Sequence, residues 1–209
     1  MSSGSRVISR PTKRTSDVDS APTRPSHTAS SIVPWSGSPI SPLWHVRTGR
    51  LWLRPVAYAD LPALRALKAD PRVYAVMLGG VRSAYETAEE LAADIAFWGR
   101  HGVGMWAVRE AQSGRFLGTV GLHLRPDGRG MAIRFALLPE VQGRGYALEA
   151  AGAALRFAHE RAGIARVVAV AREENIASRQ VLGAIGMRET GRFQRAGVTM
   201  IAYESNAAG

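Results

Sequence analysis

Residues 131–160, MAIRFALLPEVQGRGYALEAAGAALRFAHE, constrain the fold of this chain more than any other segment. Their first part predicts a strand, because large apolar side chains alternate with other residues: Ile133, Phe135 and Leu137. Pro139 ends the strand, since proline has no N–H for a sheet ladder. From Arg144 onward apolar residues recur at the spacings of an amphipathic helix: Leu148, Ala151, Leu155 and Ala158. The segment therefore predicts a strand, a glycine turn and a helix that begins inside the turn.

The turn at residues 142–147 has the features of an anion-binding site. The first N–H groups of a helix have no partner within the helix, and the helix dipole places partial positive charge there, so a phosphate docks well. Gly143 and Gly145 keep side chains out of the way, and Arg144 adds a full positive charge. A ligand that carries a diphosphate is the natural occupant.

Two familiar nucleotide-binding loops do not fit this turn. A P-loop requires Lys followed by Ser or Thr after its last glycine, whereas Tyr146 and Ala147 follow Gly145. A dinucleotide fingerprint requires a third glycine where Leu148 stands, and an acid about twenty residues further on, where residues 163–167 have none.

Composition limits the chemistry that the chain offers. It has no cysteine, which excludes a disulfide framework, a thiol nucleophile and a cysteine-bound metal. The five histidines show no metal-ligand spacing, so we expect no metal. No apolar run reaches the length of a membrane span, which favours a cytoplasmic protein with no membrane partner.

Residues 1–45 differ in composition from the rest and are predicted to form a disordered basic tail. Ser, Thr, Pro and Gly make up 24 of the first 42 residues, which leaves little to build a core. Seven basic residues and two acids up to Arg50 give half of the net charge of +10. Contact of the tail with nucleic acid or a ribosome is one interpretation, but a solvated segment in an arginine-rich chain is favoured. A transit peptide and a start codon placed too early stay open as well.

The rest of the chain, residues 46–209, predicts one domain with the element order β-α-α-β-β-β-α-β-α-β-β. We expect Asp60 to cap the first helix, and Thr87 to start the second through a capping box with Glu90. Residues 73–85 between these helices are predicted to be a loop that borders a substrate cleft. The predicted strands are 50–55, 105–110, 116–124, 131–138, 166–172, 187–194 and 198–204, and the helices are 60–69, 87–99, one from 144, and 176–185.

The glycine turn matches the pattern Gln/Arg-x-x-Gly-x-Gly/Ala and resembles the acetyl-CoA pyrophosphate loop of the GNAT superfamily of N-acetyltransferases. The element order resembles that fold across residues 50–204, and both ends of this region look most like the branch that contains the ribosomal-protein alanine N-acetyltransferases. The resemblance implies an α/β (α+β) fold with a mixed, mostly antiparallel twisted sheet of about seven strands, flanked by about four helices. It leaves a homodimer open.

The same resemblance assigns residues to acetyl-CoA. The strands before and after the central helix would lie parallel but splayed, with the pantetheine arm between them. Backbone groups of Leu137 and Leu138 would pair with the arm. The pyrophosphate would be held by Gln142, Gly143, Arg144, Gly145, Tyr146 and Ala147. Asn175 and Ser178 resemble a second family motif that faces the thiol end, although Asn175 is also well placed to cap a helix at Ile176.

The resemblance also implies direct transfer of an acetyl group to a primary amine in a ternary complex. Ser178 resembles the hydroxyl that addresses the departing sulfur, and Tyr203 is the alternative acid. A lysine ε-amine with a pKa near ~10.4 needs a base at neutral pH, whereas an α-amine near ~7.7–8.0 is partly neutral already. The family's usual acid positions hold other residues here, such as Ala132, so no base is assigned. The reserves are Glu110, Glu189 and His123.

The acceptor stays open between a protein N-terminus and a small-molecule amine. An antibiotic- or polyamine-modifying enzyme is disfavoured, because residues 73–85 contain Arg82 and no acid that would attract a cation. The alternative from another class is a non-catalytic CoA-binding or ribosome-associated protein, motivated by the missing acids and the basic tail.

Overall fold

The computed structural model describes residues 41–207, and residues 1–40 of the tail predicted at residues 1–45 lie outside this range. Its sheet has eight strands in the order β1-β2-β3-β4-β5-β6-β8-β7. The strands are β1 Val46–Arg47, β2 Leu51–Pro55, β3 Met105–Glu110, β4 Phe116–Leu124, β5 Met131–Leu137, β6 Arg166–Arg172, β7 Arg188–Arg195 and β8 Val198–Asn206. The helices are α1 Leu61–Ala69, α2 Pro71–Tyr74, α3 Ala84–His101, α4 Tyr146–Arg156 and α5 Ile176–Ala184.

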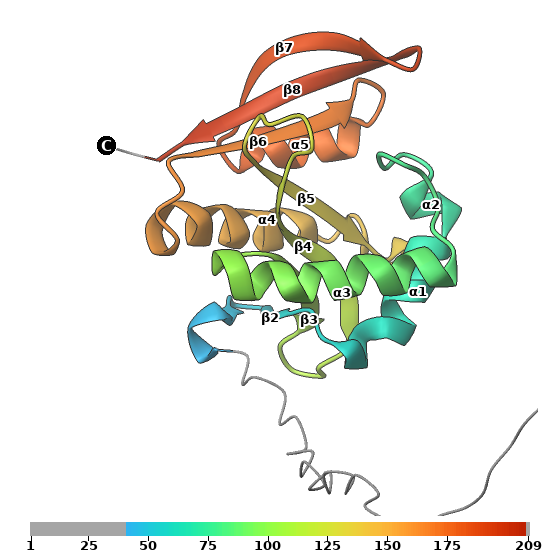
Figure 1. Ribbon diagram of the computed structural model, residues 1–209, viewed down its shortest axis with the longest axis vertical. Coiled ribbons are helices and arrows are strands. Elements are labelled where there is room, and N and C mark those ends of the chain that lie inside the picture. The colour runs from blue at the N-terminus through green and yellow to red at the C-terminus, as the bar shows by residue number, and fades with distance from the viewer. Residues whose placement is uncertain (1–40, 208–209) are drawn as a thin grey trace, which may run out of the picture. The chain divides into compact units, whose positions relative to one another are not determined.

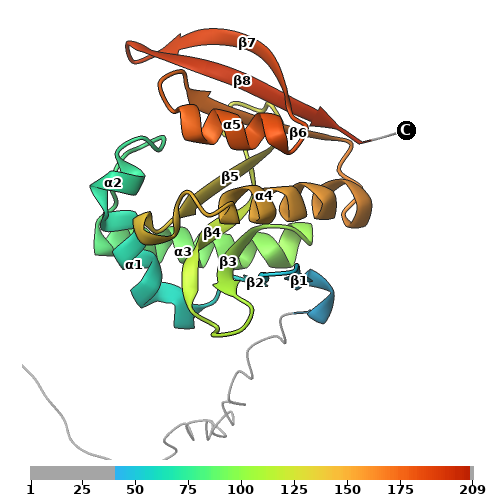
Figure 2. The same cartoon turned by 180° about the vertical axis from the view of Figure 1, so that it is seen from behind.

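Helices cover both faces of this sheet. Helix α3 lies in front of the central strands in Figure 1, and α4 and α5 lie in front in the reverse view of Figure 2. All strand pairs are antiparallel except β5 with β6. The predicted mixed and mostly antiparallel sheet is therefore confirmed. The additional strand is the two-residue β1, which is too short to show an alternating pattern.

Strands β5 and β6 separate soon after they meet. Their parallel register joins Met131 to Val167 and Ala132 to Val168, and no later pair follows along either strand. The splay that the family resemblance implies is confirmed. Because β5 continues to Leu137 beyond its last pair with β6, the backbone groups at its carboxyl end that face away from β4 have no partner in the sheet.

The core is anchored by aromatic side chains that include one from the predicted tail. Trp106 is fully buried, and its Nε1–H donates to the carbonyl oxygen of Trp44 at 2.7 Å. The ring of Trp44 stacks on Trp98 with centroids 5.2 Å apart. A short 3₁₀ helix, Pro42–Trp44, presents these groups. Residues 42–44, which composition assigned to the tail, therefore pack on the core through Trp44.

The start of α3 differs from the prediction. The helix begins at Ala84, where Ser83 and Glu86 form the capping box, rather than at Thr87. Thr87 is buried in the first turn and donates its hydroxyl hydrogen to the carbonyl oxygen of Ser83 at 2.9 Å. The predicted loop at residues 73–85 is correspondingly shorter, since α2 ends at Tyr74 and the connection to α3 spans residues 75–83.

Two side chains also take other positions than predicted. Asp60 makes no capping hydrogen bond to α1. Instead its fully buried carboxylate accepts hydrogen bonds from Arg54 at 2.7 Å and from Arg109 at 2.6 Å, which fixes α1 to β2 and β3. Leu148, predicted on the buried face of α4, is 41% exposed, because α4 turns this residue toward the groove beside α5.

Residues 41–207 contain no helix that is both long and apolar enough to cross a bilayer.

Candidate active site

A cavity of about 510 Å³ opens where the turn after β5 meets the start of α5. Eight of the residues predicted to bind the cofactor line it: Leu137, Gln142, Gly143, Gly145, Tyr146, Ala147, Asn175 and Ser178. Two others do not. Arg144, which is exposed, and Leu138, which is half-buried, are not among the lining residues.

The glycine turn presents its backbone to this cavity. Gly143 and Gly145 have φ of 73° and 76°, a left-handed conformation that favours glycine. At Gly143 a Cβ would meet no atom within 4 Å, so the backbone conformation and the open space in front of it explain the residue. Gly145 is the N-cap of α4 and no side chain caps this helix, which leaves the first N–H groups available to an anion.

The end of β5 is arranged differently from the prediction. The Leu138 N–H donates to Leu117 O at 2.9 Å and its carbonyl accepts from Val141 at 3.1 Å, so both backbone groups of Leu138 are used within the protein. Leu137 points its backbone the other way, as does Phe135 two residues earlier. Gln142 Nε2 donates to the Leu137 carbonyl at 2.9 Å. Phe135 and Leu137, rather than Leu137 and Leu138, are therefore the residues whose backbone groups point away from β4, and Phe135, Ala136 and Leu137 line the cavity.

Arg50 holds the glycine turn from outside and was not predicted to do so. Its Nη1 donates to Arg144 O at 3.0 Å, and its Nε lies 2.7 Å from Glu149 Oε2. Its guanidinium also lies 4.6 Å from the ring centroid of Tyr146. Burial alone would raise the pKa of Glu149, but hydrogen bonds from Thr48 and Arg50 hold this pKa below its usual value. Glu149 therefore has a structural role, since it joins α4 to the start of β2.

Ser178 is placed at the cavity by the cap of α5. The Asn175 side chain accepts a hydrogen bond from the Ser178 N–H at 3.1 Å, which confirms the predicted cap and fixes the first turn of the helix. Among residues 41–207 the Ser178 side chain has no hydrogen-bond partner, and it lines the cavity. Tyr203 does not line it. Tyr203 is 5% exposed in β8, and its hydroxyl accepts from Arg179 Nε at 3.2 Å.

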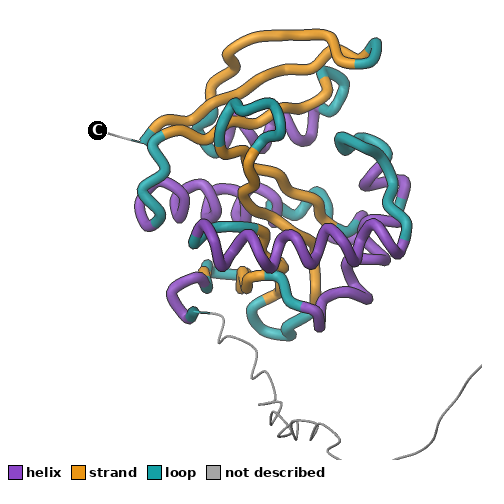
Figure 3. Tube along the Cα trace, in the orientation of Figure 1, coloured by secondary structure: helices purple, strands orange, loops and turns teal. Residues whose placement is uncertain are grey.

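A second, smaller cavity of about 130 Å³ adjoins the first. The two share five lining residues: Val76, Met77, Phe135, Asn175 and Ser178. Arg172 closes one side of the smaller cavity, since its Nη2 donates to Ala75 O at 3.0 Å and so joins the end of β6 to the α2–α3 connection. Figure 3 shows this connection and the turn after β6 on the same side of the domain.

His123 is the one reserve residue that the structure brings to these cavities. It lines the smaller one, and its Nδ1 is buried with no partner among residues 41–207. Burial, together with Arg134 and Arg125, lowers the pKa of His123 to about 4, so the ring is neutral at neutral pH. Glu110 and Glu189 lie elsewhere. Glu110 accepts from Ser113, and Glu189 pairs with Arg192 on the exposed strand β7.

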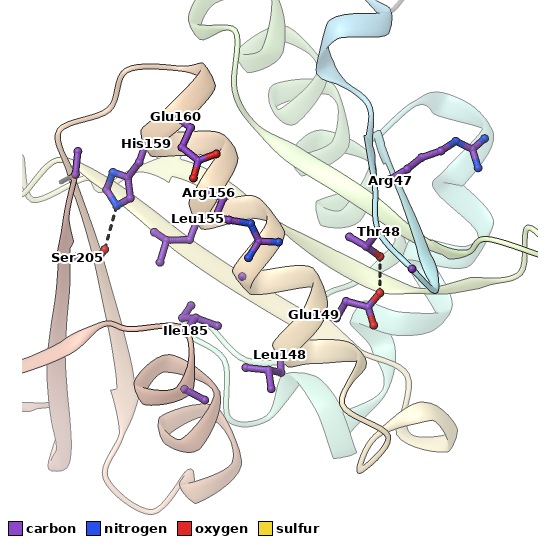
Figure 4. A pocket seen from close by; sticks show the side chains of 14 residues that line it. Arg47, Thr48, Leu148, Glu149, Leu155, Arg156, His159, Glu160, Ile185 and Ser205 are labelled. Atoms are coloured by element: carbon purple, nitrogen blue, oxygen red, sulfur yellow. Dashed lines mark hydrogen bonds between the residues drawn. The ribbon is translucent and has the colours of Figure 1, made fainter.

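A groove of about 950 Å³ runs along the other side of α4, as Figure 4 shows. It meets the first cavity at Leu148 and Ala184. His159 has both ring nitrogens occupied, with Nδ1 2.6 Å from Ile164 O and Nε2 3.0 Å from Ser205 Oγ. Glu149 is bound to Thr48 and Arg50. The groove therefore offers space beside the glycine turn rather than a reactive group.

Residues 50–188 match the family described as the Acetyltransferase (GNAT) domain. The chain belongs to this family and is an acetyl-CoA-dependent acyltransferase. A curated relative, the uncharacterized N-acetyltransferase YnaD of Bacillus subtilis (strain 168), is 26% identical over 151 residues, which cover 72% of this chain and 86% of the relative.

Solved structures agree with this assignment. An acetyltransferase from Agrobacterium tumefaciens strain C58 is 29% identical with a TM-score of 0.69, covering 78% of this chain and 94% of its own. The RimL ribosomal L7/L12 α-N-protein acetyltransferase in complex with coenzyme A is 21% identical, with a TM-score of 0.67, and covers 78% of this chain and 98% of its own. The ribosomal-protein-S5-alanine acetyltransferase from Vibrio fischeri is 15% identical, with a TM-score of 0.66, over 78% and 96%. The last two show a shared fold.

Proposed function

We propose that this protein transfers an acetyl group from acetyl-CoA directly to a primary amine, either a protein N-terminal α-amine or the amine of a small molecule. The position of Ser178 carries this proposal. Ser178 stands where the cavity beside the glycine turn meets the smaller cavity, so one hydroxyl is within the lining of both. A thioester reached from one side and an amine from the other would meet beside it.

The first cavity suits the long axis of acetyl-CoA. The pyrophosphate would dock on the N–H groups of Gly145 and the first turn of α4. The pantetheine arm would then follow the backbone of Phe135 and Leu137 toward Ser178. The nucleotide end must extend in the opposite direction, which leads past Leu148 into the groove on α4, where Arg156 is exposed.

The chemistry requires few groups. The neutral amine attacks the thioester carbonyl, the new C–N bond forms, the C–S bond breaks and the amine loses a proton to solvent. Ser178 donates a hydrogen bond to the departing thiolate, whose ordinary pKa is about 8.5, and passes it a proton while the serine oxygen takes one back from solvent, so that the proton released by the amine balances the proton gained by the thiol. Among the residues that line the smaller cavity, the carboxylate of Glu90 is bound to Lys68 and Arg82 and is no free base. An α-amine, partly neutral at neutral pH, is the acceptor that needs a base least.

The test is thiol release from acetyl-CoA with peptides and small amines as acceptors. Ser178→Ala should lower kcat by about 100-fold, the lower range for a lost general acid, and leave the Kd of acetyl-CoA within about threefold. Ser113→Ala is the matched control, because Ser113 lies in an exposed turn and bonds to Glu110.

Two outcomes would overturn the proposal. Selective acetyl-CoA binding without transfer to any amine would favour the non-catalytic alternative. A trapped acetyl-enzyme with ping-pong kinetics would exclude direct transfer.

A further inference from the structure

The smaller cavity is lined by more positive than negative charge. Four arginines line it, namely Arg82, Arg125, Arg134 and Arg172, against one acid, Glu90. Both oxygens of this acid are occupied: Oε2 lies 2.6 Å from Lys68 Nζ, and Oε1 accepts from Arg82 Nε. Within this lining no carboxylate is left to bind a cationic group.

The four arginines differ in how well they are satisfied. Arg82 is held by Glu90 and by two backbone carbonyls. Arg125 binds both oxygens of Asp127. Arg172 donates to Ala75 O and pairs with Glu174. These three side chains are therefore committed to the fold.

Arg134 is the exception. Its Nη2 lies 3.4 Å and 3.5 Å from the two oxygens of Asp94, at the outer limit of a hydrogen bond, and its Nε contacts the Met105 sulfur at 3.3 Å. Within residues 41–207 its Nη1 has no hydrogen-bond partner, and a third of its side chain is exposed. Burial raises the pKa of Asp94 although Arg134 opposes this, which indicates an imperfect pair. Arg134 thus presents unused donors to the cavity.

The lowered pKa of His123 reflects the same positive charge around the smaller cavity. After burial, the charges of Arg134 and Arg125 are the causes that lower its pKa. The ring, neutral at neutral pH, brings no charge of its own; Arg125 is paired with Asp127, whereas Arg134 has only its long contact with Asp94. An ammonium group would be repelled there, and a carboxylate would be attracted.

We propose that the acceptor amine carries a carboxylate, and that Arg134 binds this carboxylate while the amine lies beside Ser178. The inference rests on the proposed function and names the chemical class of its acceptor. Arginine binds carboxylates through two parallel hydrogen bonds, so Arg134 would fix the orientation of the acceptor as well as its charge. A peptide with an acidic side chain close to its α-amine and a free amino acid share this chemistry. Polyamines lack it.

Two matched acceptor pairs test the proposal with the full-length protein. One pair consists of peptides that begin Ala-Glu and Ala-Gln, and the other of alanine and alaninamide. We expect the acid of at least one pair to exceed its amide in kcat/KM by about tenfold or more, the size of one charge-assisted contact. The pair that shows the preference identifies the source of the carboxylate, whether peptide or free amino acid.

Arginine variants locate the effect. Arg134→Gln should bring the acid-to-amide ratio to within about twofold of one, and Arg134→Lys should retain a preference because it keeps the charge. Arg195→Gln, on the exposed β7–β8 hairpin, should leave the ratio as in the wild type. Thermal unfolding of each variant identifies any that fails to fold. The acid-to-amide ratio of the wild type tests the proposal even if a variant does not fold.

Failure would be informative. Equal use of acid and amide in both pairs by the wild type would remove the carboxylate site and leave the proposed function intact. Acetyl-CoA binding without acetylation of any acceptor would remove both.

Discussion

Gly143 permits a test that separates ligand binding from backbone strain. Gly143 and Gly128 have almost the same conformation, with φ of 73° and 72°, and a Cβ would meet nothing within 4 Å at either. Gly128 lies in the β4–β5 turn, away from the cavity. Alanine at either position should cost about 1–2 kcal/mol of unfolding free energy from left-handed strain. Only Gly143→Ala should also weaken acetyl-CoA binding, by about tenfold or more in calorimetric titration.

A loss of affinity of the same size in Gly128→Ala would show that general strain, and not the space in front of Gly143, controls binding.

His123 predicts a pH dependence of stability. Its folded pKa of about 4 lies below the ordinary value of 6.5, so between these values the unfolded chain binds more protons and stability falls as the pH is lowered. Above pH 6.5 the ring is neutral in both states and contributes no slope. Between about pH 7.5 and pH 5.0 the wild type should lose about 2 kcal/mol more unfolding free energy than His123→Gln, as measured by urea denaturation.

His45 has a lowered pKa as well, but it is present in both proteins, so the difference isolates His123. Parallel pH profiles would show that the ring is hydrated in the folded state.

Site residues could be predicted where the information is local. Gly143 and Gly145 lie in one turn, and Asn175 precedes the helix that carries Ser178, so the turn and the helix cap could be predicted from spacing, whereas the assignment of Asn175 and Ser178 to the cofactor came from the family resemblance. The role of Arg50 could not be predicted, because its partner Arg144 is 94 residues away and the contact depends on how β2 meets α4. His123 had no positional support in the sequence, since its cavity is assembled from β4, β5, β6 and the α2–α3 connection.

Among the elements, the junction of β2 with α4 carries a prediction of its own. Arg50 ties the start of β2 to the carbonyl of Arg144 and to Glu149. Arg50→Ala should loosen the glycine turn and weaken acetyl-CoA binding by about three- to tenfold. Stability should fall by less than about 1 kcal/mol, because the Arg50 side chain is 50% exposed and such ion pairs contribute little.

Arg192→Ala is the control for Arg50→Ala. Arg192 is 59% exposed and pairs with Glu173 and Glu189 away from the turn, so its loss should not change the affinity. Unchanged binding in Arg50→Ala, measured by calorimetry, would mean that the turn holds its conformation without this contact.

The start of α3 shows why element boundaries escape a local pattern. Ser83 with Glu86 and Thr87 with Glu90 both fit a capping box in the sequence. The choice is made by long-range partners, since Glu90 is held by Lys68 of α1 and by Arg82 and cannot return to cap a helix. The helical type of this segment was predicted, but its bounds were not: the predicted helix spans 87–99, whereas α3 spans Ala84–His101.

At the scale of the molecule, the order of strands and helices along the chain followed from periodicity, whereas their order in space did not. Local alternation identifies β7 and β8 but does not show that β8 pairs with β6 and leaves β7 at the edge. The splay of β5 and β6 came from the family resemblance. The positive charge of the smaller cavity could not be predicted from the sequence. Arg134 lies on β5 and Arg172 on β6, and both line this cavity because the two strands separate.

The limits of the folded domain give a final prediction, tested by two truncations that differ by five residues. Removal of residues 1–40 keeps Trp44 and should leave both the unfolding free energy and the acetyl-CoA affinity as in the full chain. Removal of residues 1–45 deletes the ring that stacks on Trp98 and the carbonyl that accepts from the buried Trp106 N–H. The second truncation should therefore lose roughly 2–4 kcal/mol, the cost of an aromatic contact and an unsatisfied buried donor.

Urea denaturation of the two truncated proteins measures this difference in unfolding free energy. Trp44→Ala in the full chain separates the contribution of the ring from that of the backbone carbonyl. The substitution removes the stacked ring and keeps the carbonyl, so its cost should lie between those of the two truncations. Equal stability of the two truncations would mean that Trp44 contributes nothing to the core. A large loss already on removal of residues 1–40 would contradict the tail proposed from composition, and would extend the domain toward the N-terminus.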